Sequence, residues 1–191
     1  MKLIGSSTSP YVRRLRLWLP ESAYEFIDLN IFTPEGRDQL RQYTPAMKVP
    51  VLVDGEQRIY DSRVISRYLT QKMNLPVLSW EDENRLTLVD AAGDSFVTLL
   101  LLKRSGVAAD AQPVCGLQNE RIGQTLKVLE GMVADGGFAD WNYPAICLYT
   151  MLDWVIFREL HDFSDLPNLS AFHKQHQQSE NVARTDPRLA V

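Results

Sequence analysis

The sequence contains little cysteine and histidine, and their spacing forms no metal or redox motif. Its two cysteines, Cys115 and Cys147, lie far apart without a Cys-x-x-Cys pair. This argues against a disulfide framework or a zinc site and favours a reducing, cytoplasmic location. His173 and His176 are spaced to share one helical face, but no carboxylate or cysteine is placed to complete a metal site. We therefore predict no metal and expect both histidines at a solvated surface.

Long apolar runs and an excess of positive charge are also missing. The longest apolar stretches, such as residues 96–102, are far shorter than the roughly 18 residues of a membrane span. The N-terminus lacks the apolar region of a secretory signal. The net charge of −4 makes nucleic acid an unsuitable partner, because phosphate binding requires a basic face. We expect neither a membrane nor a nucleic-acid partner.

The first part of the chain has the pattern of short strands alternating with helices. Strands are predicted over residues 1–5, 24–29, 49–53 and 57–60, and helices over residues 10–19, over 35–43 and after 61–62. A strand–helix–strand start implies a parallel pair with a right-handed crossover. The turn signal Asp54-Gly55 closes a hairpin, which adds antiparallel strands. The sheet is therefore predicted to be mixed and four-stranded.

Strand signals end at a linker over residues 74–79, which contains a proline. Helical spacing of apolar residues then predicts helices over residues 80–104, 113–133, 142–160 and 166–177. The expected architecture is an α/β domain over residues 1–74 followed by an all-helical domain over residues 80–191.

Four hydroxyl residues, Ser6, Ser7, Thr8 and Ser9, form the loop before the first helix, and Pro10 follows them. In the simplest interpretation Ser9 is the N-cap and Pro10 is the first helical residue. The free N–H groups and partial positive charge of a helix N-terminus also favour an anion. A hydroxyl aimed at a thiolate there would lower the thiol pKa further. Because the loop has no cysteine, any thiol acting there must arrive with a ligand.

Two further polar features precede later elements. In Lys48-Val49-Pro50 the proline forces Val49 into an extended conformation, and a cis bond there would expose its main-chain groups. Asp61-Ser62 begins the next helix, where a carboxylate, a hydroxyl and free N–H groups suit the ammonium and carboxylate of an amino acid. Taken singly, each feature is equally well explained as an ordinary turn or an ordinary N-cap.

Together, these three features resemble the N-terminal domain of cytosolic glutathione S-transferases. SPYVRRLR (residues 9–16) is similar to the SPxxxRxR start of the serine- and cysteine-type classes, KVPVLVDG (48–55) to their proline-turn segment, and YDSRVISRYL (60–69) to the ESxxIxxYL that follows. Looser similarity continues through LDWVIFREL (152–160), LPNLSAFHK (166–174) and SENVARTDP (179–187). The resemblance implies a thioredoxin-like domain followed by a helical bundle.

The resemblance also implies a site for glutathione, used as a co-substrate without a metal. The cysteine of glutathione would pair with the main chain of Val49, beside a cis Pro50. Its γ-glutamyl end would be held by Asp61 and Ser62, and Lys48 would lie near its carboxylates.

By the same resemblance Ser9 would be the catalytic residue, donating its hydroxyl to the thiolate. Tyr11 would line the pocket of a small hydrophobic electrophile, with residues from the helix that contains Phe96 and Leu100. Some classes use a serine two residues earlier, which is Ser7 here. Ser9 is favoured because it directly precedes the helical proline.

The sequence departs from the family pattern at two helix starts. Asp61 stands where many members have glutamate, so the charge is kept but the reach is shorter. Asn142 provides a cap for a later helix, but the carboxylate of the usual capping box is missing.

The activity implied is conjugation of glutathione to an electrophile, a detoxification reaction. The alternatives are a non-catalytic protein of the stringent-starvation type that binds glutathione or a protein partner, and a glutathione-dependent disulfide reductase that needs no protein thiol. A homodimer is the family expectation, and Val64, Arg67 and Arg104 are candidate contact residues.

Overall fold

The computed structural model describes residues 1–190, which form two compact units. One unit comprises Met1–Val77 and the segment that begins at Gln178, and the other comprises Leu78–Gln177. The first unit contains β1 (Lys2–Gly5), α1 (Pro10–Trp18), the 3₁₀ helix η1 (Glu21–Ala23), β2 (Glu25–Asp28), α2 (Pro34–Tyr43), β3 (Val51–Asp54), β4 (Gln57–Tyr60) and α3 (Ser62–Lys72). The predicted order of strands and helices is confirmed.

The four strands form one mixed sheet in the order β2–β1–β3–β4. β1 and β2 are parallel, with Leu3 opposite Phe26, and the crossover between them contains α1. β3 is antiparallel to β1 and forms an antiparallel hairpin with β4. The prediction of a four-stranded mixed sheet with a parallel first pair is therefore confirmed.

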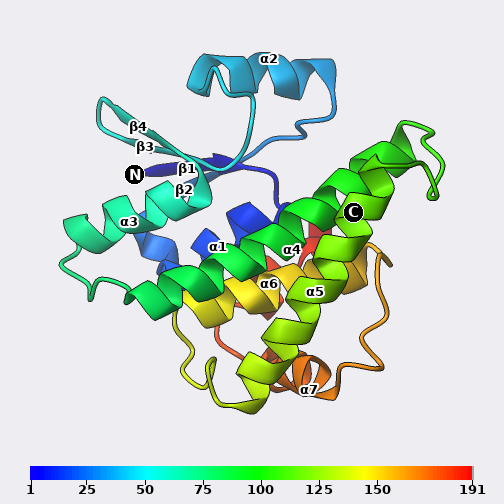
Figure 1. The fold of residues 1–191 in the computed structure, drawn as a ribbon. Helices are drawn as coiled ribbons and strands as arrows, with labels where there is room; N and C mark the ends of the chain where they lie inside the picture. The colour runs from blue at the N-terminus through cyan, green and yellow to red at the C-terminus, as the bar shows by residue number, and fades with distance from the viewer. Residues whose placement is uncertain (191) are drawn as a thin grey trace. The chain divides into compact units, whose positions relative to one another are not determined.

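Helices cover both faces of this sheet. Successive strand residues point to opposite faces, so the buried side chains of Leu3 and Ile4 enter different layers. Ile4 packs in a cluster with Leu40 of α2 and Val51 of β3. On the other face, α1 packs against α3, which also contacts β3 and β4. Figure 1 shows α2 on one side of the sheet and α1 and α3 on the other. The sheet is thus the middle layer of the first unit.

The β3–β4 hairpin turns one residue later than predicted. Asp54 pairs with Gln57, so it is the last strand residue and the turn begins at Gly55. Gly55 has φ +60°, which glycine adopts without steric cost. Asp54 accepts hydrogen bonds from Lys72 and, at 2.6 Å, from Tyr68. These two donors hold the pKa of the Asp54 carboxyl below its usual value and tie α3 to the sheet.

The second unit is helical throughout its described length. It contains α4 (Trp80–Arg104), α5 (Val114–Ala134), α6 (Tyr143–Phe157) and α7 (Pro167–His176), close to the predicted bounds. Asn142 Oδ1 caps α6 by accepting from the N–H of Ala145 at 3.2 Å, and every residue of α6 from Tyr143 to Val155 is buried. α6 is therefore the core helix of this unit. Within residues 1–190, none of the helices combines the length and apolar character that a bilayer span requires.

The last part of the chain groups with the first unit. The 3₁₀ helices η2 (Ala183–Thr185) and η3 (Pro187–Ala190) follow α7, and the segment from Gln178 clusters with Met1–Val77. The predicted helical domain covered residues 80–191, so the structure divides the chain differently. The physical reason is that Arg13 of α1 hydrogen-bonds to Val182 and Thr185 of this segment.

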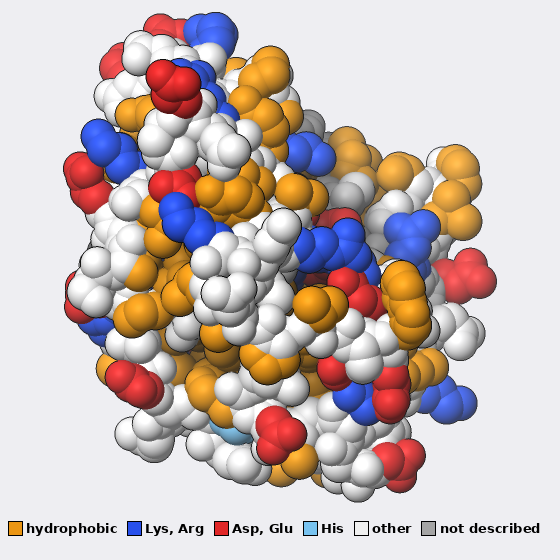
Figure 2. Space-filling model, turned by 90° about the vertical axis from the view of Figure 1, so that its left-hand side faces the viewer, with side chains coloured by type: hydrophobic (Ala, Val, Ile, Leu, Met, Phe, Trp, Pro, Cys, Tyr) orange, Lys and Arg blue, Asp and Glu red, His pale blue; other side chains and the backbone are white. Residues whose placement is uncertain are grey.

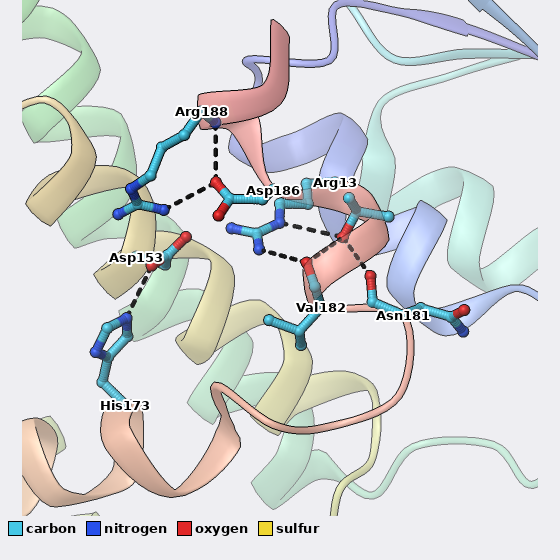
Figure 3. Close-up of polar contacts among 8 residues, drawn as sticks. Arg13, Asp153, His173, Asn181, Val182, Asp186 and Arg188 are labelled. Carbon is cyan, nitrogen blue, oxygen red and sulfur yellow. Dashed lines mark hydrogen bonds and ion pairs between the residues drawn. The ribbon is translucent and has the colours of Figure 1, made fainter.

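The prediction that His173 and His176 lie at a solvated surface is wrong. Their exposed fractions are 7% and 6%, and on the face drawn in Figure 2 histidine is visible only as a small patch. His173 Nε2 lies 2.9 Å from Oδ1 of Asp153, a buried residue of α6 (Figure 3), and the His173 ring stacks on Tyr149. The His176 ring stacks on Trp141 with centroids 4.3 Å apart. These partners are distant in sequence, so the local pattern around the histidines could not reveal them.

Burial lowers the pKa of His176, because Trp141 and Phe172 enclose its ring and its protonated form loses hydration. The folded state thus disfavours the protonated ring relative to the unfolded chain, where the pKa is about 6.5. The stability that this ring contributes is fully present above the unfolded-state pKa. It is lost as the pH falls through the lower pKa of the folded state.

We expect the free energy of unfolding to decline as the pH falls below about 6.5, the unfolded-state pKa of histidine, and His176→Phe to make that decline shallower. The phenyl ring keeps an aromatic contact with Trp141 but takes up no proton. Urea unfolding of both proteins over this pH series measures the difference. Parallel pH profiles for the two proteins would contradict the prediction.

Candidate functional site

Three strand ends meet at one edge of the sheet in the first unit. β1 ends at Gly5, and its antiparallel register pairs Ile4 with Val51, the first residue of β3. Val51 in turn pairs with Tyr60, the last residue of β4. The loop after β1, the segment before β3 and the start of α3 therefore lie beside one another. The structure thus brings together the three polar features that the sequence analysis singled out, and we call this edge the candidate site.

Ser9 is the N-cap of α1. Its Oγ accepts a hydrogen bond from the N–H of Val12 at 3.4 Å, and its own N–H donates to the carbonyl of Ser6 at 3.0 Å. The side chain is half-buried, and its hydroxyl proton has no acceptor within residues 1–190. Capping uses only the oxygen as an acceptor, so the O–H group remains able to donate to a ligand at the positive end of α1.

The rest of the loop is held by other hydrogen bonds. The N–H of Ser7 donates to Oδ1 of Asp28, the last residue of β2, at 2.9 Å. The hydroxyls of Ser6 and Thr8 lie 3.1 Å apart and bond to each other. Asp28 is a contributor that the sequence analysis missed, because only the parallel β1–β2 register brings it next to the loop.

Val49 and Pro50 lie directly before β3 and are joined by a cis peptide bond, as predicted. Pro50 is buried, and the side chain of Val49 packs against the core of this unit. Among residues 1–190 the main chain of Val49 has no hydrogen-bond partner. Its N–H and C=O groups are therefore available to an extended ligand backbone, as at a sheet edge. Lys48 is exposed beside them and has no ion-pair partner in the described part of the chain.

Asp61 caps α3 from an uncommon backbone conformation. Its Oδ1 accepts from the N–H groups of Arg63, at 2.9 Å, and Val64, at 3.3 Å. Its side chain is exposed, and Oδ2 has no partner within residues 1–190. The φ angle of +70° is rare for a residue with a side chain. Such conformations cost about 1–3 kcal/mol and are concentrated at active sites and ligand clamps.

Arg14 links α1 to α3 and was not identified from the sequence. Its Nη1 donates to Oγ of Ser62 at 3.4 Å, and both residues are buried. Its guanidinium also lies over the ring of Tyr11, 4.9 Å from the centroid. A buried positive charge behind the Ser62 hydroxyl favours an anion at this point of the edge. The sequence shows several arginines in this helix, but it gives no signal for which of them is buried.

Residues considered for an electrophile pocket or for thiol chemistry also lie in the helical unit. Residues from the helix that contains Phe96 and Leu100 were expected to line an electrophile pocket; Phe96 of this helix is 2% exposed, and its ring lies 5.9 Å from that of His161. We assign it instead to the core of that unit. Cys115 and Cys147 are both buried there, and neither forms a disulfide. In the described chain, no group of three metal-ligating side chains is close enough to hold an ion.

Comparison with known proteins identifies the family. Residues 3–77 match the family described as glutathione S-transferase, N-terminal domain. Over nearly its whole length the chain is 30% identical to the uncharacterized GST-like protein YibF of Escherichia coli strain K12, and the alignment covers 98% of each protein. The chain belongs to the glutathione S-transferase family.

Solved structures of glutathione S-transferases share the fold of this family member. A glutathione S-transferase from Methylobacillus flagellatus KT, solved with glutathione bound, matches with a TM-score of 0.85 at 21% identity, over 97% of this chain and 98% of that one. A glutathione transferase family member from Pseudomonas fluorescens Pf-5, also with bound glutathione, matches with a TM-score of 0.78 at 25% identity and the same coverage. The predicted fold, a thioredoxin-like domain followed by a helical domain, is confirmed.

Substitutions of Asp61 separate its capping role from its charge. We expect Asp61→Ala to lower the free energy of unfolding by at least about 1 kcal/mol, because α3 loses its cap. Asn keeps a capping oxygen and tolerates positive φ. We therefore expect Asp61→Asn to lower the free energy of unfolding by only a small fraction of the loss in Asp61→Ala, about a few tenths of a kcal/mol. Urea unfolding followed by circular dichroism measures both. Equal losses in the two variants would show that the cap contributes nothing.

Proposed function

We propose that this glutathione S-transferase family protein binds glutathione, stabilises its thiolate and transfers it to an electrophile. The observation that carries the proposal is the convergence at one sheet edge of three groups: a helix start with a donor hydroxyl, the main chain of Val49, which has no hydrogen-bond partner within residues 1–190, and an exposed capping carboxylate. These groups suit the thiol, the peptide backbone and the γ-glutamyl end of glutathione in turn. Relatives that were solved with bound glutathione support the same choice of ligand.

Ser9 is the proposed catalytic residue. The positive end of α1 and a hydrogen bond from the Ser9 hydroxyl both favour the charged form of a thiol. Lowering a thiol pKa from about 8.5 to about 6.5 corresponds to about 2.7 kcal/mol of preferential interaction with the thiolate. The thiol proton leaves to water, and the thiolate sulfur then forms a bond to the electrophilic carbon. Either a leaving group departs from that carbon with its bonding electron pair, or the π pair of a polarised double bond moves to the far atom and takes up a proton from water. Ser9 forms no covalent bond to the substrate, so no general base is needed to activate it.

The remaining candidate residues are proposed to position glutathione. The main chain of Val49, beside cis Pro50, would pair with the backbone of the glutathione cysteine. Asp61 Oδ2 would accept from the γ-glutamyl ammonium. Ser62, supported by Arg14, would donate to the adjacent carboxylate, and Lys48 would attract the other carboxylate of the ligand.

Tyr11 is proposed to line the pocket of a small hydrophobic electrophile. It follows Ser9 by two residues on α1, and its side chain is partly exposed. An aromatic ring offers an apolar surface beside the proposed thiolate.

Replacing Ser9 tests the proposed chemistry. We expect Ser9→Ala to raise the pKa of the bound glutathione thiol by about one unit, a tenfold smaller thiolate population well below that pKa. The measurement is ultraviolet thiolate absorbance against pH in the complex. Loss of the α1 cap should also cost about 1 kcal/mol of stability, so the titration is run where both proteins are fully folded.

Ser7→Ala is the matched control, since it alters the same loop without touching the helix cap. We expect it to leave the thiol pKa unchanged. A shift in Ser7→Ala alone would transfer the role to Ser7, and no shift in either variant would sink the mechanism. Glutathione affinity without turnover of activated electrophiles would favour the partner-binding alternative.

We also propose that the protein is a homodimer. Val64, which is 49% exposed, lies on α3 in the first unit, and Arg67 lies one turn further along the same helix. Subunit interfaces have an apolar core and are enriched in arginine, so these two residues suit an interface. We expect Val64→Glu to shift the sedimentation coefficient from that of two chains to that of one. A monomeric wild-type protein at micromolar concentration would contradict the proposal.

A further inference from the structure

The guanidinium of Arg13 is buried against the C-terminal part of the chain. Arg13 lies in the first turn of α1 and is 2% exposed. Its Nε donates to Oγ1 of Thr185 at 3.3 Å. Its Nη2 donates to the carbonyl of Val182 at 3.2 Å, and Figure 3 shows the Arg13 side chain directed toward Val182. A buried charge is tolerated only where hydrogen bonds replace its hydration. The turn that contains Val182 and Thr185 supplies two of those bonds.

This C-terminal turn, residues 181–185, is held by its own hydrogen bonds and by burial. Thr185 is 1% exposed, and its hydroxyl donates to the carbonyl of Asn181 at 2.9 Å while accepting from Arg13. The turn also forms an ion pair beyond the other end of α1, where Arg184 Nη1 lies 3.2 Å from Oε1 of Glu21 in η1. The turn therefore contacts the chain at the first turn of α1 and again after its last turn. Glu21 is exposed, whereas Arg184 is half-buried, so water screens this ion pair more than the buried hydrogen bonds of Arg13.

Arg13, which makes the buried hydrogen bonds to the C-terminal turn, is close in sequence to Ser9 of the candidate site. The N–H of Arg13 donates to the carbonyl of Ser9 at 3.0 Å, which is the first hydrogen bond of α1. The same turn of helix carries the Ser9 Oγ contact to the N–H of Val12. Fixing the Arg13 side chain therefore restrains the backbone turn from which the Ser9 hydroxyl projects.

We propose that Arg13 is a positioning residue for Ser9, and that the C-terminal turn around Thr185 is the anchor through which it acts. The inference rests on the proposed function, because it concerns the aim of the hydroxyl at the glutathione thiol. It gives residues after Gln178 a role at the candidate site, although the sequence analysis assigned them to the helical domain. Hydrogen bonds to a charged acceptor weaken steeply with angle and distance, so a loosened α1 start stabilises the thiolate less.

Two substitutions at Thr185 provide a matched test. Thr185→Val keeps the size and branching of the side chain but removes the acceptor of Arg13 Nε, whereas Thr185→Ser keeps the hydroxyl. Hydrogen exchange of the α1 amides is measured first, without ligand. We expect several-fold faster exchange in Thr185→Val and near wild-type exchange in Thr185→Ser. Unchanged exchange in Thr185→Val would overturn the anchor.

The thiolate titration of bound glutathione is measured next in the same proteins. We expect the thiol pKa to rise by about 0.5 in Thr185→Val, about a threefold loss of thiolate at low pH, and to recover in Thr185→Ser. Faster exchange with an unchanged thiol pKa would overturn the positioning role, because a purely structural contact changes only the first measurement.

Arg184→Gln is the control at the other contact of the turn. It removes the ion pair with Glu21 and the hydrogen bond from Arg184 Nε to Oδ1 of Asn181. Both acceptors of Arg13 are kept, so the exchange and the thiol pKa should stay as in the wild type. If Arg184→Gln changed the exchange and the thiol pKa as much as Thr185→Val does, the effect would not depend on Arg13 and the proposal would be wrong. If the wild-type protein fails to bind glutathione, the proposed function fails, while the exchange comparison still decides whether the turn anchors α1.

Discussion

The hydrogen-bonded register of β1, β3 and β4 is the constraint on which the rest of this structure depends. Ile4 opposite Val51, and Val51 opposite Tyr60, bring one end of each strand to the same edge. A slip of one residue would exchange the faces of the buried side chains, so the core packing holds this register. The loop of Ser9, the segment that contains Val49 and the cap Asp61 are neighbours only because of this register. Site geometry and core packing are thus two results of one pairing pattern.

Each of these groups has a structural role that leaves a ligand-binding capacity unused. Ser9 caps α1 with its oxygen and keeps its proton. Asp61 caps α3 with one carboxylate oxygen and keeps the other. Two buried arginines of α1 form hydrogen bonds near these groups. Arg14 donates to Ser62, and Arg13 donates to Thr185. The choice posed by the sequence, an ordinary N-cap or a binding residue, is therefore not exclusive, because one side chain can do both.

Local signals predicted most of the fold. Pro10 after a serine, the Val49-Pro50 pair and the helical spacing over residues 80–104 all depend on a few neighbouring residues, and the structure confirms the elements they predicted. Long-range contacts could not be predicted from one sequence. The burial of His173 depends on Asp153, a partner twenty residues away, and the grouping of the last residues with the first unit depends on contacts of Arg13 across 169 and 172 positions.

The most direct test of this account is the ultraviolet titration of the thiol in the wild-type protein saturated with glutathione. We predict saturable binding and a bound thiol pKa below that of free glutathione, since α1 and Ser9 both favour the thiolate. Binding with the thiol pKa of free glutathione would mean that this edge holds the ligand without activating it. No binding at millimolar glutathione would contradict the central claim.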